Sequence, residues 1–198
     1  MISLALRFAS SLFQLHNDNI RLCKQGDPML RQPARELSND EINTEDFKTL
    51  VDRMVQIMQE HGGQGLAAPQ VGIDVQLIVF QFTEDDYQNA LKCYGKHGVQ
   101  KREMRVFPLT VLVNPKMKVS DFNRTVFEEG CLSLQRTVGK VERYKTISVE
   151  GLNEHGEIIQ FNATGWMARI LQHEIHHLKG ILISDCFVKM KSRHWFQR

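Results

Sequence analysis

Residues 173–177 form the sequence His-Glu-Ile-His-His, whose residue types and spacing can hold a metal ion. On a helix, His173 and His177 lie one turn apart on the same face, so both imidazoles can bind one cation. Glu174 projects beside them and can take a proton from metal-bound water and later deliver it to a leaving amine. His176 could instead pair with His173, but its spacing aligns the two rings less well. We therefore predict a metal-dependent hydrolase rather than a solvated, histidine-rich helix end.

A catalytic metal site needs a third protein ligand and an open position. No glutamate follows Glu174, which excludes the arrangement of thermolysin-like peptidases. The metzincin pattern His-Glu-x-x-His-x-x-Gly-x-x-His matches through Gly180, but Ile183 occupies its last histidine position. Asp185 and His194 are downstream alternatives without a supporting pattern. We therefore expect the third ligand to lie upstream.

Cys131 is the best upstream candidate, in the sequence Glu-Glu-Gly-Cys-Leu-Ser at 128–133. A thiolate is a strong ligand for Zn²⁺ or Fe²⁺, and the adjacent glycine lets the backbone approach a metal closely. The alternative is a buried structural cysteine, the commoner role of a lone cysteine.

The segment 63–72 is rich in small residues, with the sequence Gly-Gln-Gly-Leu-Ala-Ala-Pro-Gln-Val-Gly. It lacks the Gly-Lys-Ser/Thr of a phosphate loop and follows no predicted strand, so nucleotide binding is not expected. Its small residues can let a substrate backbone pair with the chain, and Gln70 can donate a hydrogen bond to an oxyanion. A tight helix-to-strand connection explains the segment equally well.

The composition limits the class of protein. The chain has 198 residues, of which 42% are apolar and 24% are charged, typical of one globular domain with a real core. A net charge of +2 is too small to indicate nucleic-acid binding, and no DNA partner is expected. The cysteines form no Cys-x-x-Cys pair and no disulfide framework, which indicates a reducing cytosol. No stretch approaches the length of a membrane span, so no membrane partner is expected.

Apolar periodicity predicts two helices, over 44–61 and 166–178. Strands are predicted over 75–82, 110–114, 146–149 and 158–161, the second ending at Pro115 and the last two joined by a hairpin turn at 153–156. The polar stretch 84–105 is predicted to hold a long charged loop or insertion. Because strands surround the helices without strand–helix alternation, we expect an α+β fold, with antiparallel β-sheets around a central helix that carries the metal motif.

Three motifs occur in a fixed order: Gly-x-Gly-Leu-Ala-Ala-x-Gln at 63–70, Glu-Gly-Cys-Leu-Ser at 129–133 and Gln-His-Glu-x-x-His at 172–177. With these motifs the chain strongly resembles the peptide deformylase family. The similarity extends to 26–31, 141–143 and 177–180, so it covers the chain from about residue 20 to Asp185. The resemblance implies an enzyme that removes the formyl group from the N-formyl-methionyl end of newly made polypeptides and releases formate. The rival hypotheses are a zinc peptidase that cuts internal bonds and a catalytically silent relative that binds formylated ends.

The resemblance also implies the roles of individual residues. Cys131, His173 and His177 would bind one divalent ion, usually Fe²⁺ in this family, with Zn²⁺ or Ni²⁺ as substitutes. Glu174 would be the general acid and base, and Gln70 and the backbone N–H of Leu132 would stabilise the oxyanion. The residues implied to bind substrate are Gly63, Gln64, Gly65, Glu129, Gly130, Trp166 and Arg169.

The sequence departs from the family at two places. His176 replaces the usual aspartate, so we expect a structural ion pair to be missing, and Leu134-Gln135-Arg136 replaces Val-Pro-Gly in the cleft wall. Residues 107–109 and 165–169 resemble the organelle-associated branch, so we expect Trp166 and Arg169 to reshape the methionine pocket. Because every chemical residue is retained, we expect activity.

We expect three sections along the chain: an N-terminal extension (1–19), a catalytic domain (20–187) and a basic C-terminal tail (188–198). A cytoplasmic location is the main prediction, and organellar targeting by the acid-free N-terminal segment is the weaker alternative. The tail carries Lys189, Lys191, Arg193 and Arg198 without an acid, which allows contact with ribosomal RNA. A solvated basic tail is the commoner arrangement.

Overall fold

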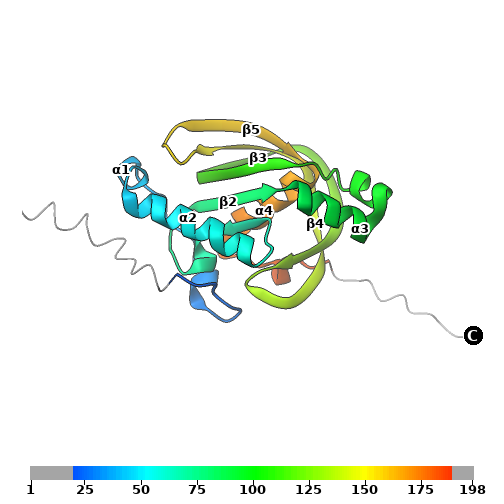
Figure 1. The fold of residues 1–198 in the computed structure, drawn as a ribbon, viewed down its shortest axis with the longest axis horizontal. Coiled ribbons are helices and arrows are strands. Elements are labelled where there is room, and N and C mark those ends of the chain that lie inside the picture. The colour runs from blue at the N-terminus through cyan, green and yellow to red at the C-terminus, as the bar shows by residue number, and fades with distance from the viewer. Residues whose placement is uncertain (1–19, 189–198) are drawn as a thin grey trace, which may run out of the picture.

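The computed structural model describes residues 20–188, whose strands form one antiparallel sheet (Figure 1). The strand order follows the chain: β1 (Gly65–Ala67), β2 (Leu77–Phe82), β3 (Phe107–Cys131), β4 (Leu134–Leu152) and β5 (Ile158–Thr164). The helices are α1 (Asn39–Ile42), α2 (Glu45–Glu60), α3 (Glu84–Lys101) and α4 (Gly165–Leu178), with short 3-10 helices at Pro28–Arg31, Ala68–Val71 and Ile183–Cys186. The predicted α+β class is confirmed, with a single sheet. The predicted extension 1–19 and residues 189–198 of the predicted tail lie outside the described residues.

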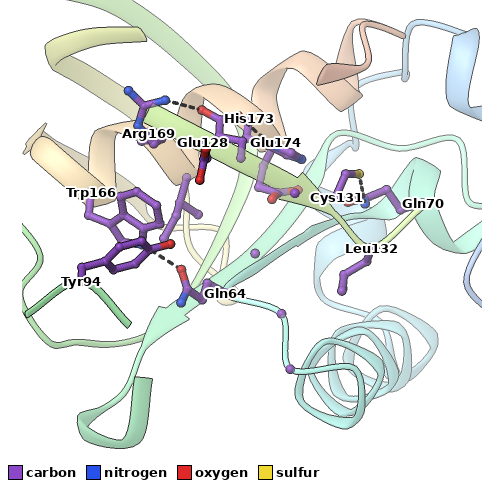
Figure 2. A pocket seen from close by; sticks show the side chains of 16 residues that line it. Gln64, Gln70, Tyr94, Glu128, Cys131, Leu132, Trp166, Arg169, His173 and Glu174 are labelled. Carbon is purple, nitrogen blue, oxygen red and sulfur yellow. Dashed lines mark hydrogen bonds and ion pairs between the residues drawn. The ribbon is translucent and has the colours of Figure 1, made fainter. Parts of the chain in front are cut away.

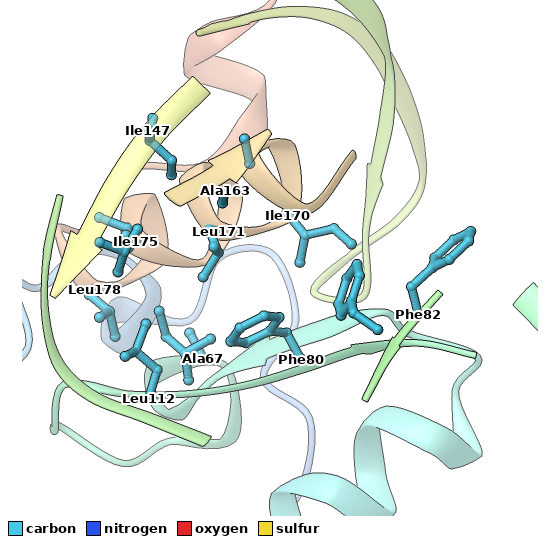
Figure 3. Close-up of a cluster of buried hydrophobic side chains, with 14 of the residues drawn as sticks. Ala67, Phe80, Phe82, Leu112, Ile147, Ala163, Ile170, Leu171, Ile175 and Leu178 are labelled. Atoms are coloured by element: carbon cyan, nitrogen blue, oxygen red, sulfur yellow. The ribbon is translucent and has the colours of Figure 1, made fainter. Parts of the chain in front are cut away.

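Strand β2 lies between two helices, because alternate side chains of a strand point to opposite faces. Leu77 and Val79 pack in one apolar cluster with the buried face of α2. Ile78 and Phe80 pack in a second cluster with Leu171 and other residues of α4. Figure 3 shows Phe80 and Leu171 in this cluster. The near-continuous apolar sequence of β2 is therefore the consequence of burial on both faces.

Helix α4 is the central helix, and it contacts β1, β2, β4 and β5. Its core face carries Ala168, Leu171, Ile175 and Leu178, all buried at helical spacing. Each large side chain of this kind contributes about 1.5–3 kcal/mol when buried. The face carrying residues 166, 169, 170, 173 and 174 lines a cleft instead. The sheet therefore fixes one face of α4 and leaves the other for the site.

The predicted loop over 84–105 is wrong, because the structure has helix α3 there. Thr83 and Asp86 form a capping box that starts the helix, and Ala90 and Val99 are buried against the rest of the molecule. The helix is interrupted at Gly95, whose backbone is non-helical. Few apolar residues and this internal break conceal the helical period in the sequence.

The predicted end of a strand at Pro115 is also wrong, because β3 continues to Cys131. The register with β4 shifts between Val113 and Lys116, so that Asn114 and Pro115 lie in a bulge. A bulge accommodates a proline, which has no N–H to donate to the ladder. The extension matters for the site, because Cys131 is the last residue of β3. None of the helices within residues 20–188 has both the length and the apolar character needed to cross a bilayer.

The capping box of α3 gives a test of this helix. The hydroxyl of Thr83 accepts from the Asp86 N–H at 3.1 Å, and the Asp86 carboxylate accepts from the Thr83 N–H at 2.8 Å. We expect Thr83→Ala to lower the free energy of unfolding by about 1 kcal/mol, since helix N–H groups lose their acceptor. Urea unfolding followed by circular dichroism measures the change. Thr83→Ser keeps the hydroxyl and serves as control; an equal loss in both variants would contradict the role of the cap.

Candidate metal centre and active-site cleft

Three side chains with metal-binding atoms meet at one point. Helix α4 places His173 and His177 one turn apart, and the end of β3 brings Cys131 against them. The Cys131 Sγ lies 3.3 Å from the His177 Nε2, which lies 3.3 Å from the His173 Nε2. All three atoms are within 4.8 Å of one another, and both histidines are buried. The structure thus brings together the three residues predicted as ligands.

The hydrogen-bonding roles of these rings fit a cation. His173 Nδ1 lies 3.1 Å from a Glu129 carboxylate oxygen, so Nδ1 carries the proton and the lone pair of Nε2 faces the cluster. Burial holds the pKa of His177 well below its ordinary value, so this ring is neutral. Two imidazole nitrogens and a sulfur therefore converge at close range, a donor set that suits Zn²⁺ or Fe²⁺.

Glu129 supports the cluster from behind. One carboxylate oxygen accepts from Arg143 Nε at 3.0 Å and from Arg169 Nη1 at 2.7 Å. The other accepts from Arg143 Nη2 at 2.8 Å and faces His173. Burial alone would raise the pKa of Glu129, but the hydrogen bonds from His173 and Arg143 hold it well below its ordinary value. Glu129, predicted to bind substrate, lines the cleft, but both of its oxygens contact protein groups.

We expected a structural ion pair to be missing at His176, and the structure has a hydrogen bond at this position instead. Arg143 Nη1 donates to His176 Nδ1 at 3.0 Å, and the thiol of Cys186 lies 3.5 Å from the same nitrogen. Burial and the charge of Arg143 lower the pKa of His176 to about 4, so the ring is neutral and can accept. The link from α4 to Arg143 is therefore kept without a second carboxylate.

Glu174 is buried beside the cluster and against β1. Burial raises the pKa of Glu174 to about 7. One of its carboxylate oxygens has no hydrogen-bond partner among residues 20–188. A Cβ at Gly65 would lie 2.5 Å from the other oxygen, so only glycine lets β1 approach this closely. Glu174 is therefore a carboxyl that can hold or release a proton near neutral pH.

The side-chain amide of Gln70 has a fixed orientation. Its oxygen accepts from the backbone N–H of Ala67 at 2.8 Å. Its nitrogen donates to the Ser133 hydroxyl at 3.3 Å and lies 3.6 Å from the Cys131 Sγ. The amide N–H₂ therefore points toward the cluster, while Leu132, next to Cys131, lines the same cleft (Figure 2).

The cleft, about 350 Å³ in volume, runs along the free face of α4. Among residues 20–188, β1 is at the edge of the sheet and pairs with β2 alone, so no strand lies along its second edge. Every residue predicted to bind substrate lines this cleft. The list is Gly63, Gln64, Gly65, Glu129, Gly130, Trp166 and Arg169.

Arg169 and Trp166 make contacts that the sequence did not predict. Arg169 is buried, and besides Glu129 it donates to the backbone oxygens of Val141 and Thr125, so it ties α4 to β3 and β4. The indole N–H of Trp166 donates to the Gln64 side-chain oxygen at 2.8 Å, which links α4 to the glycine-rich segment.

Sequence reasoning missed Tyr94, which lies on α3 and lines the cleft. A signal was present, because Tyr87, Ala90, Leu91 and Tyr94 have the spacing of one helix face. The prediction of a loop over this stretch hid that spacing.

The polypeptide deformylase family profile matches residues 20–193. The chain is 38% identical to the chloroplastic peptide deformylase 1A of Solanum lycopersicum over 83% of this chain and 58% of the relative. It is 36% identical to the mitochondrial peptide deformylase of Homo sapiens over 87% of this chain and 68% of that relative. Against the peptide deformylase of Dehalococcoides mccartyi the identity is 34% over 83% and 84% of the two chains. The chain spans somewhat less than three fifths of the length of the plant relatives it matches.

Solved structures agree with the sequence comparisons. A class I type b peptide deformylase from Acinetobacter baumannii with Met-Ala-Ser bound superposes with a TM-score of 0.74, at 31% identity, over 85% of this chain and 98% of that one. A peptide deformylase from Synechococcus elongatus in complex with actinonin gives a TM-score of 0.70 at 33% identity, over 86% and 80%. On its sequence, its fold and its Cys/His cluster, the chain belongs to the polypeptide deformylase family.

Proposed function

We propose that this protein removes the formyl group from the N-formyl-methionyl end of newly made polypeptides and releases formate. Membership of the family supports the reaction class. The observation that carries the proposal is the buried Glu174 beside a Cys/His cluster in a cleft. One of its carboxylate oxygens has no hydrogen-bond partner within residues 20–188. A hydrolase needs such an acid and base next to the reacting carbonyl.

One divalent ion per chain would be held by the Cys131 thiolate and by the Nε2 atoms of His173 and His177. Fe²⁺ is the proposed native ion, with Zn²⁺ or Ni²⁺ as substitutes. When bound, such a cation makes water more acidic and polarises a carbonyl oxygen. Glu129 contributes by fixing the orientation of His173, since it binds the other ring nitrogen.

Glu174 performs both proton transfers. As a carboxylate it accepts a proton from the water that attacks the formyl carbon. As the carbon–nitrogen bond breaks, it returns that proton to the leaving nitrogen, which becomes the free N-terminus. A pKa of about 7 suits both steps, because neither protonation state is strongly favoured at neutral pH.

Gln70 and the backbone N–H of Leu132 would stabilise the negative charge on the formyl oxygen during attack. The Gln70 N–H₂ is preorganised, because the amide oxygen is held by the Ala67 N–H. Donors fixed in advance cost no reorganisation when charge develops.

The glycine-rich segment would bind the substrate backbone. The open edge of β1 at Gly65 and the backbone at Gly130 both line the cleft, so an extended peptide can lie between them. This arrangement directs the N-terminal end of the peptide toward Glu174, which contacts Gly65. A formyl carbon bears only hydrogen, so a tight site can exclude larger acyl groups by shape.

Formate release from formyl-Met-Ala-Ser tests the proposed function directly. We expect the Fe²⁺-loaded full chain to release formate, and Glu174→Ala to keep its metal but lose at least about a hundredfold in kcat, since both proton transfers are lost. The exposed Glu142→Gln serves as the control with unchanged turnover. Cleavage of an unblocked peptide would instead support the peptidase hypothesis, and binding without formate release would support the silent relative.

The metal-binding role of Cys131 can be measured by elemental analysis. We expect Cys131→Ala to lower bound metal at least about tenfold, because a thiolate is the strongest of the three donors. Cys186→Ala is the matched control: this cysteine is also half-buried, but its Sγ lies against His176 rather than in the cluster. Equal metal content in the two variants would remove Cys131 from the ligand set.

The cellular location of the protein and its binding to ribosomes are predictions. We propose a cytoplasmic location, with an organelle as the alternative, since relatives from plants and human carry organellar names. Binding to ribosomes would depend on the basic tail and weaken as salt rises. Cell fractionation, followed by sedimentation with ribosomes before and after deletion of residues 189–198, measures both. Recovery from an organelle, or sedimentation unaffected by the deletion, would contradict these predictions.

A further inference from the structure

Tyr94 reaches the cleft because α3 is broken beside it. Gly95, the next residue, has φ 65° and ψ 171°, so the first part of the helix ends at Tyr94 and the chain changes direction. A Cβ on Gly98 would lie 2.7 Å from the Cβ of Tyr94, so the second part of α3 approaches Tyr94 more closely than any other residue type permits. Tyr94 is 40% exposed and lines the cleft, so a ligand can cover its ring.

Arg102 holds the ring of Tyr94 in place. Its guanidinium carbon lies 4.0 Å from the centroid of the Tyr94 ring and 4.6 Å from that of Phe127 on β3. The same guanidinium donates to the Gly98 backbone oxygen at 3.2 Å. Cation–π contacts with two rings, together with this hydrogen bond, fix Tyr94 relative to β3.

Tyr94 and Trp166 lie at the end of the cleft away from Cys131 and Gln70 (Figure 2). Trp166 precedes His173 by two turns of α4, a distance of roughly 10 Å along the helix axis. In a formyl-methionyl group, six bonds separate the formyl carbon from the terminal methyl, a reach of roughly 7 Å. A methionine side chain that runs along α4 from the metal cluster therefore ends near these two rings.

We propose that Tyr94 determines specificity by closing, with Trp166, the pocket for the first side chain of the substrate, and that Arg102 positions Tyr94. This inference rests on the proposed deformylase function. A thioether makes favourable contacts with aromatic rings, whereas a short side chain at the first position leaves both rings uncovered. The aromatic end thus favours methionine over small residues.

The selectivity of the full, metal-loaded chain tests this proposal. The quantity to measure is the ratio of kcat/KM for formyl-Met-Ala-Ser to that for formyl-Ala-Ala-Ser. We expect Tyr94→Ala to lower this ratio about three- to tenfold, mainly through KM for the methionine peptide, since one thioether–aromatic contact is lost. Tyr94→Phe keeps the ring and should keep the ratio within about twofold. Phe122→Ala, which removes an exposed aromatic ring outside the cleft, is the matched control.

Binding of Met-Ala-Ser, measured by calorimetry, separates positioning from direct contact. Tyr94→Ala should raise its Kd about three- to tenfold with unchanged metal content. Arg102→Ala should also raise the Kd. The double variant should bind no more weakly than Tyr94→Ala alone, because Arg102 acts through the ring of Tyr94. Additive losses would overturn the positioning role of Arg102.

Different results would contradict the proposed function and the role of Tyr94. If the wild-type chain releases no formate from formyl-Met-Ala-Ser, the proposed function is wrong. If it releases formate while Tyr94→Ala keeps both the selectivity ratio and the Kd, the role of Tyr94 is overturned. Tyr94→Leu, which keeps an apolar side chain of moderate size, gives the same comparison if the alanine variant does not fold.

Discussion

A single buried carboxylate, that of Glu129, connects the parts of the molecule that build the site. Its two oxygens bind Arg143 of β4 and Arg169 and His173 of α4, while its own backbone belongs to β3. Burying three charged groups costs several kcal/mol per ion, and only good geometry with complete hydrogen bonding offsets that cost. Here both guanidiniums have further acceptors, on His176 and on the backbone of Val141 and Thr125. The network therefore fixes the orientation of the His173 ring.

The other constraint is the close approach of β1 to α4. Glu174 has little room, because Gly65 contacts its carboxylate directly, and Gly63 similarly leaves space for the side chain of Leu132. The same glycines leave the outer edge of β1 without bulky side chains. One sequence feature thus serves packing and substrate access together: the glycines bury the acid and keep the cleft open. Segment 63–72 is both a tight connection and a wall of the cleft, so the two interpretations of its small residues do not exclude each other.

Site residues that lie close together in the sequence could be predicted from their spacing. The spacing of His173 and His177 on an apolar helix depends only on helix geometry, and the helix occurs as predicted. For Cys131, the motif resemblance was needed to choose a metal ligand over a structural cysteine, because the position of this residue depends on a strand that passes through Pro115. The contacts of Glu129 with two arginines could not be predicted, since they join residues 14 and 40 positions apart by packing alone. Tyr94 was missed because α3 is stabilised by a capping box and a few buried side chains rather than by a regular apolar stripe.

The charges around the cluster explain how the chain tolerates His176. Glu129 contributes one negative charge, Arg143 and Arg169 contribute one positive charge each, and His176 is neutral. This buried group therefore carries a net positive charge, whereas the aspartate usual at position 176 would have made it neutral. The neutral ring of His176 still accepts the hydrogen bond from Arg143, so α4 stays joined to β4 although the carboxylate is lost. The substitution thus removes a charge from the support of the site and keeps the contact that orients Arg143 toward Glu129.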